Sequence, residues 1–198
     1  PTVLFFIIKG SFLFNFFIFI CFLITTYEWL KLSKNNLLKL FGTIFIVISF
    51  YTIFNIRNEF DRDYFHLLLV VIICVSTDIG GYVFGNIFKG PKLTKISPKK
   101  TYSGVIGSFL LSLIFTNLFL DFLSNVETFE FTKEMFLFIL LVSLVSQIGD
   151  IIISYFKRKS KIKDTGTIIP GHGGILDRID GMIFALPFAY VFFLNFNF

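Results

Sequence analysis

Long, unbroken apolar runs constrain the fold of this chain more than any other feature. Six runs of about 16–25 residues approach the ~20 residues that a helix needs to cross ~30 Å of hydrocarbon. They cover Ser11–Leu30, Leu37–Ile56, Tyr64–Phe88, Ser103–Leu123, Glu134–Phe156 and Gly181–Phe196. A backbone in lipid must satisfy its hydrogen bonds internally, so we expect helices. The prediction is an all-α, polytopic integral membrane protein with about six transmembrane helices.

Composition supports this fold class and bounds the domain organisation. The 198 residues are 55% hydrophobic, and charged residues make up 16%, below the ~25% of a soluble domain. No repeat or low-complexity linker interrupts the chain. We therefore predict one transmembrane domain, with two spans in residues 1–70 and a catalytic part in residues 71–198. The run Phe5–Ile8 is too short for a signal-peptide core, and no small-residue cleavage site follows it.

Lysine and arginine are unevenly distributed between the loops. Fourteen of the 18 follow the first, third and fifth predicted spans. The other side has Lys9, Arg57, Arg62 and Lys133. The positive-inside rule therefore places the odd-numbered loops in the cytoplasm and both chain ends outside. The two longest basic loops then share a face and can form one site. The net charge of +5 favours anionic lipid or phosphate ligands over nucleic acid.

Four aspartates stand apart from the acidic loop rims. They are Asp78 in the third span, Asp150 in the fifth, and Asp177 and Asp180 at the start of the sixth. An aspartate within a span is expensive and usually functional, which makes these residues candidate metal ligands. The alternative is a structural ion pair between helices. It stays open for Asp78 and is less favoured for Asp150, because of the neighbours of Asp150.

Those neighbours follow helical spacing. Asp150, Ser154, Lys157 and Lys161 stand at i, i+4, i+7 and i+11, which predicts one stripe along a helix, and Arg158 adds a further charge. Hard cations such as Mg²⁺ take oxygen ligands, often one or two carboxylates plus substrate phosphates. A carboxylate followed by a basic rim therefore indicates a platform for a metal ion and a phosphate. Snorkelling basic residues at a helix end would explain the lysines but not Asp150.

The stretch 163–180 reads KDTGTIIPGHGGILDRID and is unusually polar for this chain. Glycines around His172 can form a nest of N–H groups for an anion. Asp177 and Asp180, at i and i+3, share a face of a helical turn. Paired carboxylates beside lysines are what metal-assisted phosphoryl or nucleotidyl transfer requires. For His172 we favour binding or loop orientation over general acid–base catalysis. An ordinary glycine-rich turn is the alternative.

The second basic loop reads KGPKLTKISPKKTYSG, from Lys89 to Gly104. It offers lysines and hydroxyls that could bind a nucleoside triphosphate or a lipid phosphate: Ser97, Lys99, Lys100 and Thr101. A generic positive-inside loop is the alternative. Gly81 and Gly85 predict a smooth helix face for close packing. Asp78 lies one turn before Gly81, so its span can approach the site.

Residues 154–180 read SYFKRKSKIKDTGTIIPGHGGILDRID and resemble the signature of the phosphatidate cytidylyltransferase family, the bacterial CDP-diacylglycerol synthases. The shared pattern is Ser, then Lys-Arg, Lys-Asp, His-Gly-Gly and Asp-Arg-x-Asp. Asp78, the run Ser97–Thr101 and the pair Gly149-Asp150 match further family motifs. The resemblance covers Val71 to the C-terminus, whereas residues 1–70 match only as hydrophobic spans.

The resemblance implies that CTP and phosphatidic acid react to give CDP-diacylglycerol and pyrophosphate. It implies Mg²⁺, a monovalent cation such as K⁺ beside it, a homodimer, and an active site on the cytoplasmic face of a bacterial-type inner membrane. The implied metal ligands are Asp150 and Asp177, with Asp180 and Asp78 beside them. The implied catalytic residues are Asp150, Asp177, Lys163, Asp164 and His172. The implied substrate-binding residues are Ser154, Lys157, Arg158, Arg178, Ser97, Lys99, Lys100, Thr101, Gly173 and Gly174.

The chain also departs from the family pattern. Ser103 stands where the family often has Glu, and Asn86 where it often has Arg. The family commonly has additional N-terminal spans. Two other functions remain alternatives. One is a CTP-dependent polyprenol or phytol kinase, which would transfer the γ-phosphate, and the other is a small ion transporter using Asp78 and Asp150.

Overall fold

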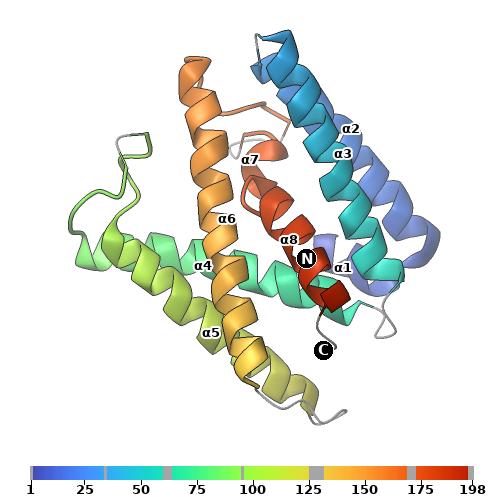
Figure 1. The fold of residues 1–198 in the computed structure, drawn as a ribbon, viewed down its shortest axis with the longest axis vertical. Coiled ribbons are helices and arrows are strands. Elements are labelled where there is room, and N and C mark those ends of the chain that lie inside the picture. Colours follow the sequence, from blue (N-terminus) through green and yellow to red (C-terminus); the bar gives the residue numbers. More distant parts are fainter. Residues whose placement is uncertain are drawn as a thin grey trace.

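A computed structural model describes residues 2–33, 35–59, 64–94, 96–124, 132–168 and 173–195 of the chain. Within these ranges the protein is built of helices, with no β-strand, as Figure 1 shows. The helices are α1 (Thr2–Lys9), α2 (Ser11–Leu32), α3 (Asn36–Asn58), α4 (Phe65–Phe88), α5 (Tyr102–Ser124), α6 (Lys133–Lys159), α7 (Leu176–Ile179) and α8 (Met182–Asn195). The predicted all-α fold class is confirmed.

The predicted spans correspond to α2–α6 and α8. Within the described residues, α2–α6 are long and apolar enough to cross a membrane. Helix α8 is apolar but has only 14 residues, fewer than the ~20 that cross ~30 Å of hydrocarbon. The start predicted for the sixth span, Gly181, lies one residue before α8, and the one-turn helix α7 precedes it. The sequence reading also missed α1 as a separate helix.

Helix α8 occupies the centre of the fold. Figure 1 shows α2, α3 and α6 around it, with α4 and α5 crossing beneath α6. Helix α8 contacts α3, α4 and α6, and it buries Ile183, Ala185, Leu186 and Ala189. A helix that is apolar around its whole circumference is stable in such a central position. This packing places the chain just before α8, with Asp180, against the inner face of α6.

Glycines hold α4 and α5 close together, and this is the most extensive helix pair of the fold. A Cβ atom added to Gly104 would lie 2.8 Å from the carbonyl oxygen of Gly81, and one added to Gly81 would lie 2.9 Å from Ser108 Oγ. Ser108 Oγ also donates to the carbonyl of Thr77 at 2.7 Å. Gly81 therefore lies at the predicted close contact, whereas Gly85 faces Thr101 Oγ1, just before the start of α5.

Three helix ends meet where the basic loops lie. Trp29 of α2 packs edge-on against Phe156 of α6, with ring centroids 5.3 Å apart, and its indole N–H donates to the carbonyl of Lys39 in α3. Ser160, just after α6, donates to the carbonyl of Leu32 at 2.7 Å. These contacts fix the C-terminal end of α2 against α3 and α6.

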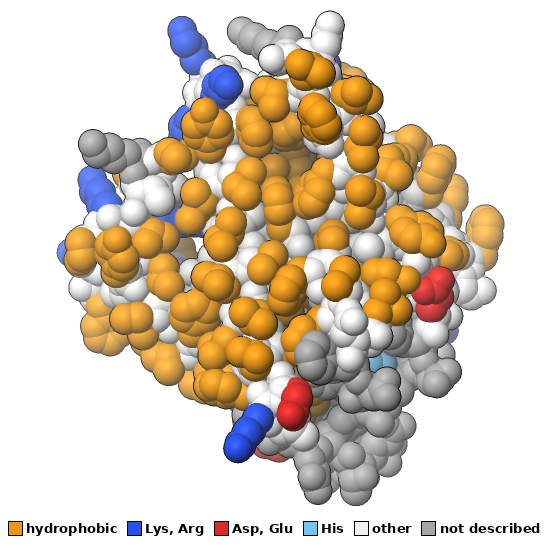
Figure 2. All heavy atoms as spheres, viewed as in Figure 1, with side chains coloured by type: hydrophobic (Ala, Val, Ile, Leu, Met, Phe, Trp, Pro, Cys, Tyr) orange, Lys and Arg blue, Asp and Glu red, His pale blue; other side chains and the backbone are white. Residues whose placement is uncertain are grey.

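The surface carries the pattern of a lipid-facing protein. In Figure 2, hydrophobic side chains cover most of the visible face, while lysine and arginine side chains lie mainly along its upper and left margins. Many large apolar residues are exposed, among them Phe12 and Phe122 at 75% each. Contiguous apolar surface of this extent is unfavourable in water and favourable in lipid.

Candidate active site

The four aspartates singled out in the sequence line one cavity of about 340 Å³. Asp78 comes from α4, Asp150 from α6, Asp177 from α7, and Asp180 from the residue that follows α7. The cavity is also lined by Ser97, Lys99, Lys100 and Thr101 of the second basic loop. The structure therefore brings together acidic and basic residues from four separate parts of the chain.

A compact set of hydrogen bonds shapes the second basic loop. The N–H of Leu93 donates to the carbonyl of Lys100 at 2.8 Å, which folds the loop back on itself. Thr101 Oγ1 accepts from the N–H of Gly104 at 3.1 Å in the first turn of α5. Ser103, where the family often has Glu, donates to the carbonyl of Lys89 and contacts Thr101 Oγ1 at 2.9 Å. Ser103 thus closes the loop by joining its two ends.

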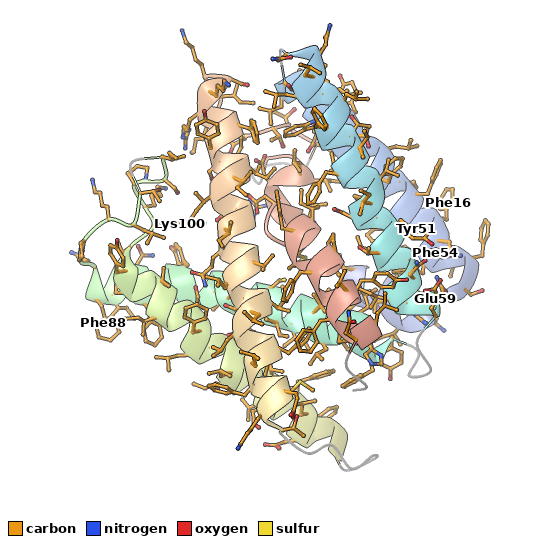
Figure 3. All side chains as sticks on the ribbon, in the orientation of Figure 1. Phe16, Tyr51, Phe54, Glu59, Phe88 and Lys100 are labelled. Atoms are coloured by element: carbon orange, nitrogen blue, oxygen red, sulfur yellow. The ribbon has the colours of Figure 1, made fainter. Side chains whose placement is uncertain are left out.

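Lys100 connects this loop to α6. Its Nζ lies 2.5 Å from Asp150 Oδ2 and donates to the carbonyl of Gln147 at 3.3 Å, and Figure 3 shows it reaching from the loop towards α6. Ser154 Oγ donates to the other carboxylate oxygen of Asp150 at 3.2 Å. The Ser154–Asp150 contact has the i, i+4 spacing expected on one helix face. Asp150 is thus held by both of its carboxylate oxygens.

Lys157 connects α6 to the acidic pair. It is buried, and its Nζ lies 2.9 Å from Asp177 Oδ1 and 3.6 Å from Asp180 Oδ2. Both carboxylates therefore face one ammonium group, as the i, i+3 spacing indicates. The predicted stripe on α6 ends at Lys157. The prediction that Lys161 continues this stripe is wrong, because α6 ends at Lys159 and Lys161 adopts a positive φ of 59° in the following turn.

Asp177 joins two segments of the polar stretch. Its Oδ2 accepts from the N–H of Thr165 at 2.7 Å, from Thr165 Oγ1 at 3.0 Å and from the N–H of Gly174 at 2.9 Å. Burial by itself would raise the pKa of Asp177, but hydrogen bonds from Gly174, Lys157 and Thr165 outweigh it and hold that pKa below its usual range. Gly173 has a φ of +85°, and a side chain there would approach Asp177 Oδ2.

Asp180 has the opposite electrostatic environment. Burial of its carboxyl group, and then the negative charge of Asp150, raise the pKa of Asp180 well above its usual range. The nearby lysine opposes this rise without cancelling it. Carboxylates that crowd together in this way are stabilised by a positive ion between them, and oxygen donors suit a hard divalent cation.

The donor set therefore fits the chemistry of Mg²⁺, although the protein's own lysines now supply the opposing charge. Among the residues that the structure describes, no three histidine, cysteine or acidic side chains form a ready-made metal-binding group. Lys100 and Lys157 contact three of the four aspartates instead. The assignment of Asp78, Asp150, Asp177 and Asp180 as metal ligands stays a prediction.

A second cavity, of about 830 Å³, lies beside the first. It is lined by Lys163, Asp164, Gly173 and Arg178 of the polar stretch, together with Lys31 of α2. Many of the predicted substrate-binding and catalytic residues therefore line one of two cavities, and hydrogen bonds from Thr165 to Asp177 connect the two linings.

The remaining predicted residues that the structure describes line neither cavity. Ser154, Lys157 and Gly174 contact the lining of the first cavity indirectly, through hydrogen bonds to Asp150 or Asp177. Arg158 lines neither cavity, because it is exposed and donates to the carbonyl of Ile162 at 3.4 Å. His172 lies outside the described residues. The structure therefore does not bring Arg158 to the aspartates, and the role expected for His172 stays a prediction.

Two further residues, Glu28 and Thr165, contact the signature residues of the site and were not predicted from the sequence. Glu28 is 1% exposed and accepts hydrogen bonds from Thr165 Oγ1, from the N–H of Ile175 and from the N–H of Leu176. A signal was present, since Glu28 stands between two aromatic residues inside an apolar run. Its role could not be predicted from that signal, because its hydrogen-bond donors lie 137–148 residues further along the chain.

Comparison with known proteins places the chain in a family. The model of the Cytidylyltransferase family matches residues 34–196. The chain belongs to this family. It is 39% identical over 168 residues to a phosphatidate cytidylyltransferase of Rickettsia typhi, a match that covers 81% of this chain and 72% of the relative. The resemblance recognised in the sequence is therefore confirmed.

More distant relatives carry the same name. A phosphatidate cytidylyltransferase of Haemophilus influenzae is 36% identical over 169 residues, covering 81% of this chain and 59% of the relative. One from Staphylococcus saprophyticus is 33% identical over 172 residues, covering 83% and 64%. The matched range 34–196 contains the loops that form both cavities, and it begins after Glu28.

Proposed function

We propose that this protein transfers the cytidylyl group of CTP to phosphatidic acid, which gives CDP-diacylglycerol and pyrophosphate. One observation carries the proposal. In a chain whose relatives are named phosphatidate cytidylyltransferase, four aspartates and a lysine loop converge on one cavity. Carboxylates beside lysines suit the transfer of a highly charged phosphate group better than they suit an ion path.

The chemistry requires one bond to form and one to break. A phosphate oxygen of the lipid attacks the α-phosphorus of CTP, and the bond from that phosphorus to the bridging oxygen of pyrophosphate breaks. A phosphate monoester is already anionic and needs little help from a general base. Binding or loop orientation is therefore the role that we propose for His172.

The lysines would position the charged groups. Lys99 and Lys100, with the hydroxyls of Ser97 and Thr101, face the cavity and would bind the triphosphate through charge-assisted hydrogen bonds. Lys157 would keep Asp177 and Asp180 in place from α6. In the second cavity, Lys163 and Arg178 would bind further phosphate oxygens.

Asp150 and Asp177 would hold Mg²⁺, with Asp180 and Asp78 in support and a monovalent ion such as K⁺ beside it. The bound metal ion would draw negative charge from the transferring phosphate. Ser154 would orient the carboxylate of Asp150 by its hydrogen bond.

We further propose that the site faces the cytoplasm at the inner membrane of a bacterium, in a homodimer. The support is the concentration of lysines and arginines in the loops that form the two cavities, which the positive-inside rule assigns to the cytoplasm. CTP is cytosolic, and a site near the membrane surface suits a substrate whose acyl chains stay in lipid.

Labelled CTP tests the reaction directly. The purified protein is incubated with phosphatidic acid vesicles, Mg²⁺ and CTP labelled at either the α- or the γ-phosphate. We expect the α label in lipid and the γ label in pyrophosphate. A γ label in lipid would indicate a lipid kinase and contradict the proposal. No lipid label, combined with ion flux in liposomes, would favour a transporter.

A further inference from the structure

Glu28 precedes the family signature in the sequence, but its carboxylate is buried against residues of that signature. We propose that Glu28 is a positioning residue, which holds the segments 163–168 and 173–180 (the signature segments) together and so sets the position of Asp177. Its importance for catalysis rests on the proposed function. Its importance for the order of the signature segments does not.

Both oxygens of Glu28 are used. Oε1 accepts from the N–H of Ile175 at 3.1 Å, and Oε2 accepts from the N–H of Leu176 at 2.8 Å and from Thr165 Oγ1 at 3.0 Å. The first two donors belong to the start of α7, and the third belongs to the other signature segment. One side chain from α2 thus binds backbone and side-chain groups that lie 137–148 residues further along the chain.

Thr165 links Glu28 to the candidate metal ligand. Thr165 Oγ1 lies 3.0 Å from Glu28 Oε2 and also 3.0 Å from Asp177 Oδ2. A hydroxyl has one proton, so it donates to one carboxylate at a time. The backbone N–H of Thr165 secures Asp177 independently, at 2.7 Å. A shift of Glu28 would therefore displace Thr165 and, with it, two of the donors that hold Asp177.

Two glycines leave room for this carboxylate. A Cβ atom added to Gly166 would lie 2.6 Å from Glu28 Oε1, and one added to Gly174 would overlap both oxygens of Glu28. Gly174 also donates its N–H to Asp177. The lack of a side chain at these two positions therefore has a physical reason, which is close approach to a residue of α2.

The end of α2 is rigid enough to act as an anchor. Trp29 packs against Phe156 of α6, Leu32 accepts from Ser160, and Gly42 of α3 leaves space for the ring of Trp29. A position fixed in this way can transmit a defined geometry to the loops. Supporting residues of this kind usually affect activity by about 10–100-fold when they are changed.

Substitution of Glu28 by glutamine is the most informative change. Glutamine has nearly the same shape, but its NH₂ group replaces one acceptor, so at least one of the three donors loses its partner. Thr165→Val removes the link to Asp177 at a different residue, while Thr165→Ser retains the hydroxyl. Glu59→Gln is a matched control, because Glu59 lies at the far end of α3, accepts from Tyr190 and is well separated from Lys100 in Figure 3.

Three measurements on the full chain in lipid nanodiscs test the proposal. They are kcat and KM for CTP, the unfolding temperature, and the rate of trypsin cleavage after the exposed Lys161 and Lys163 relative to Lys99. We expect Glu28→Gln and Thr165→Val to lower kcat about 10–100-fold and to speed cleavage after Lys161 and Lys163, at an unfolding temperature close to wild type. Thr165→Ser and Glu59→Gln should behave like wild type. The double variant Glu28→Gln/Thr165→Val should be little worse than either single one.

The outcomes separate this inference from the proposed function. If wild type does not transfer the cytidylyl group, the proposed function fails, and the cleavage rates still decide the role of Glu28. Wild-type kcat and wild-type cleavage in Glu28→Gln would overturn the inference. Reduced activity in Glu28→Gln that follows only a fall in unfolding temperature, with Thr165→Val fully active, would also overturn it.

Discussion

Replacement of Lys157 by methionine tests the central electrostatic contact of the site. Methionine keeps most of the volume of the side chain but removes the ammonium that lies 2.9 Å from Asp177 and 3.6 Å from Asp180. Breaking a buried ion pair costs about 3–5 kcal/mol, and a single hydrogen bond to a charged group contributes about 1.5–3 kcal/mol. Asp177 retains three other donors. We therefore expect Lys157→Met to lower the free energy of unfolding by about 2–4 kcal/mol.

The matched control is Lys159→Met, two residues along the same helix. Lys159 is exposed and contacts only the face of the Tyr155 ring, at 6.0 Å, among the interactions that the structure describes, so its loss should cost less than about 1 kcal/mol. A loss of 2–4 kcal/mol corresponds to a fall of roughly 5–15 °C in unfolding temperature for a chain of this size.

Unfolding temperature and cytidylyl transfer are both measured for the two variants. We expect Lys157→Met to unfold at a lower temperature and to lose most of its activity, while Lys159→Met keeps both properties. A Lys157→Met protein as stable and active as Lys159→Met would refute the reasoning, because the buried ammonium would then contribute nothing to the arrangement of Asp177 and Asp180.

Three further predictions concern the carboxylates. Asp150→Asn or Asp177→Asn should abolish turnover in protein that is still extracted in folded form; substantial Mg²⁺-dependent activity would contradict the ligand assignment. Chelation of divalent ions should stop the reaction, and added Mg²⁺ should restore it; full activity in excess chelator would count against a metal. The lowered pKa of Asp177 means that its ionised form stabilises the fold above about pH 3.9, the ordinary aspartate value, and that this contribution is lost as the pH falls through the folded pKa. The difference in unfolding temperature between wild type and Asp177→Asn should therefore shrink in acid, and a constant difference would exclude this origin.

The apolar runs predicted most of the fold because helix formation in lipid depends on length and hydropathy, both of which the sequence contains. The one-turn helix α7, which precedes the last span, was not predicted as a separate helix. Gly181 packs against α6, where an added Cβ atom would lie 2.8 Å from the carbonyl oxygen of Ser146. This close contact and the hydrogen bonds that Glu28 accepts from Ile175 and Leu176 hold the chain on either side of α7. Both depend on distant residues, so no local pattern reveals them.

The sequence predicted which polar residues gather at the site, but not how they are paired. The local pair Asp150–Ser154 followed from helical spacing, and so did the shared face of Asp177 and Asp180. Lys100 could not be matched to Asp150 in this way, because 50 residues and the whole of α5 separate them. Glu28 was missed for the same physical reason, since its partners come together only when α2 packs beside the signature segments.

The pairing has a consequence for how charge is balanced at the site. Lys100 and Lys157 oppose the carboxylates of Asp150, Asp177 and Asp180, and Lys100 also lines the cavity in which we propose that the triphosphate binds. A triphosphate that attracts Lys100 would leave Asp150 less neutralised, and burial, followed by the negative charge of Asp150, already raises the pKa of Asp180. A cation that arrives with the nucleotide would offset that negative charge. Under the proposed function, the same lysines would neutralise the buried carboxylates before substrate binds and would release them to a metal ion and its nucleotide, while Glu28 and Thr165 would hold Asp177 in place.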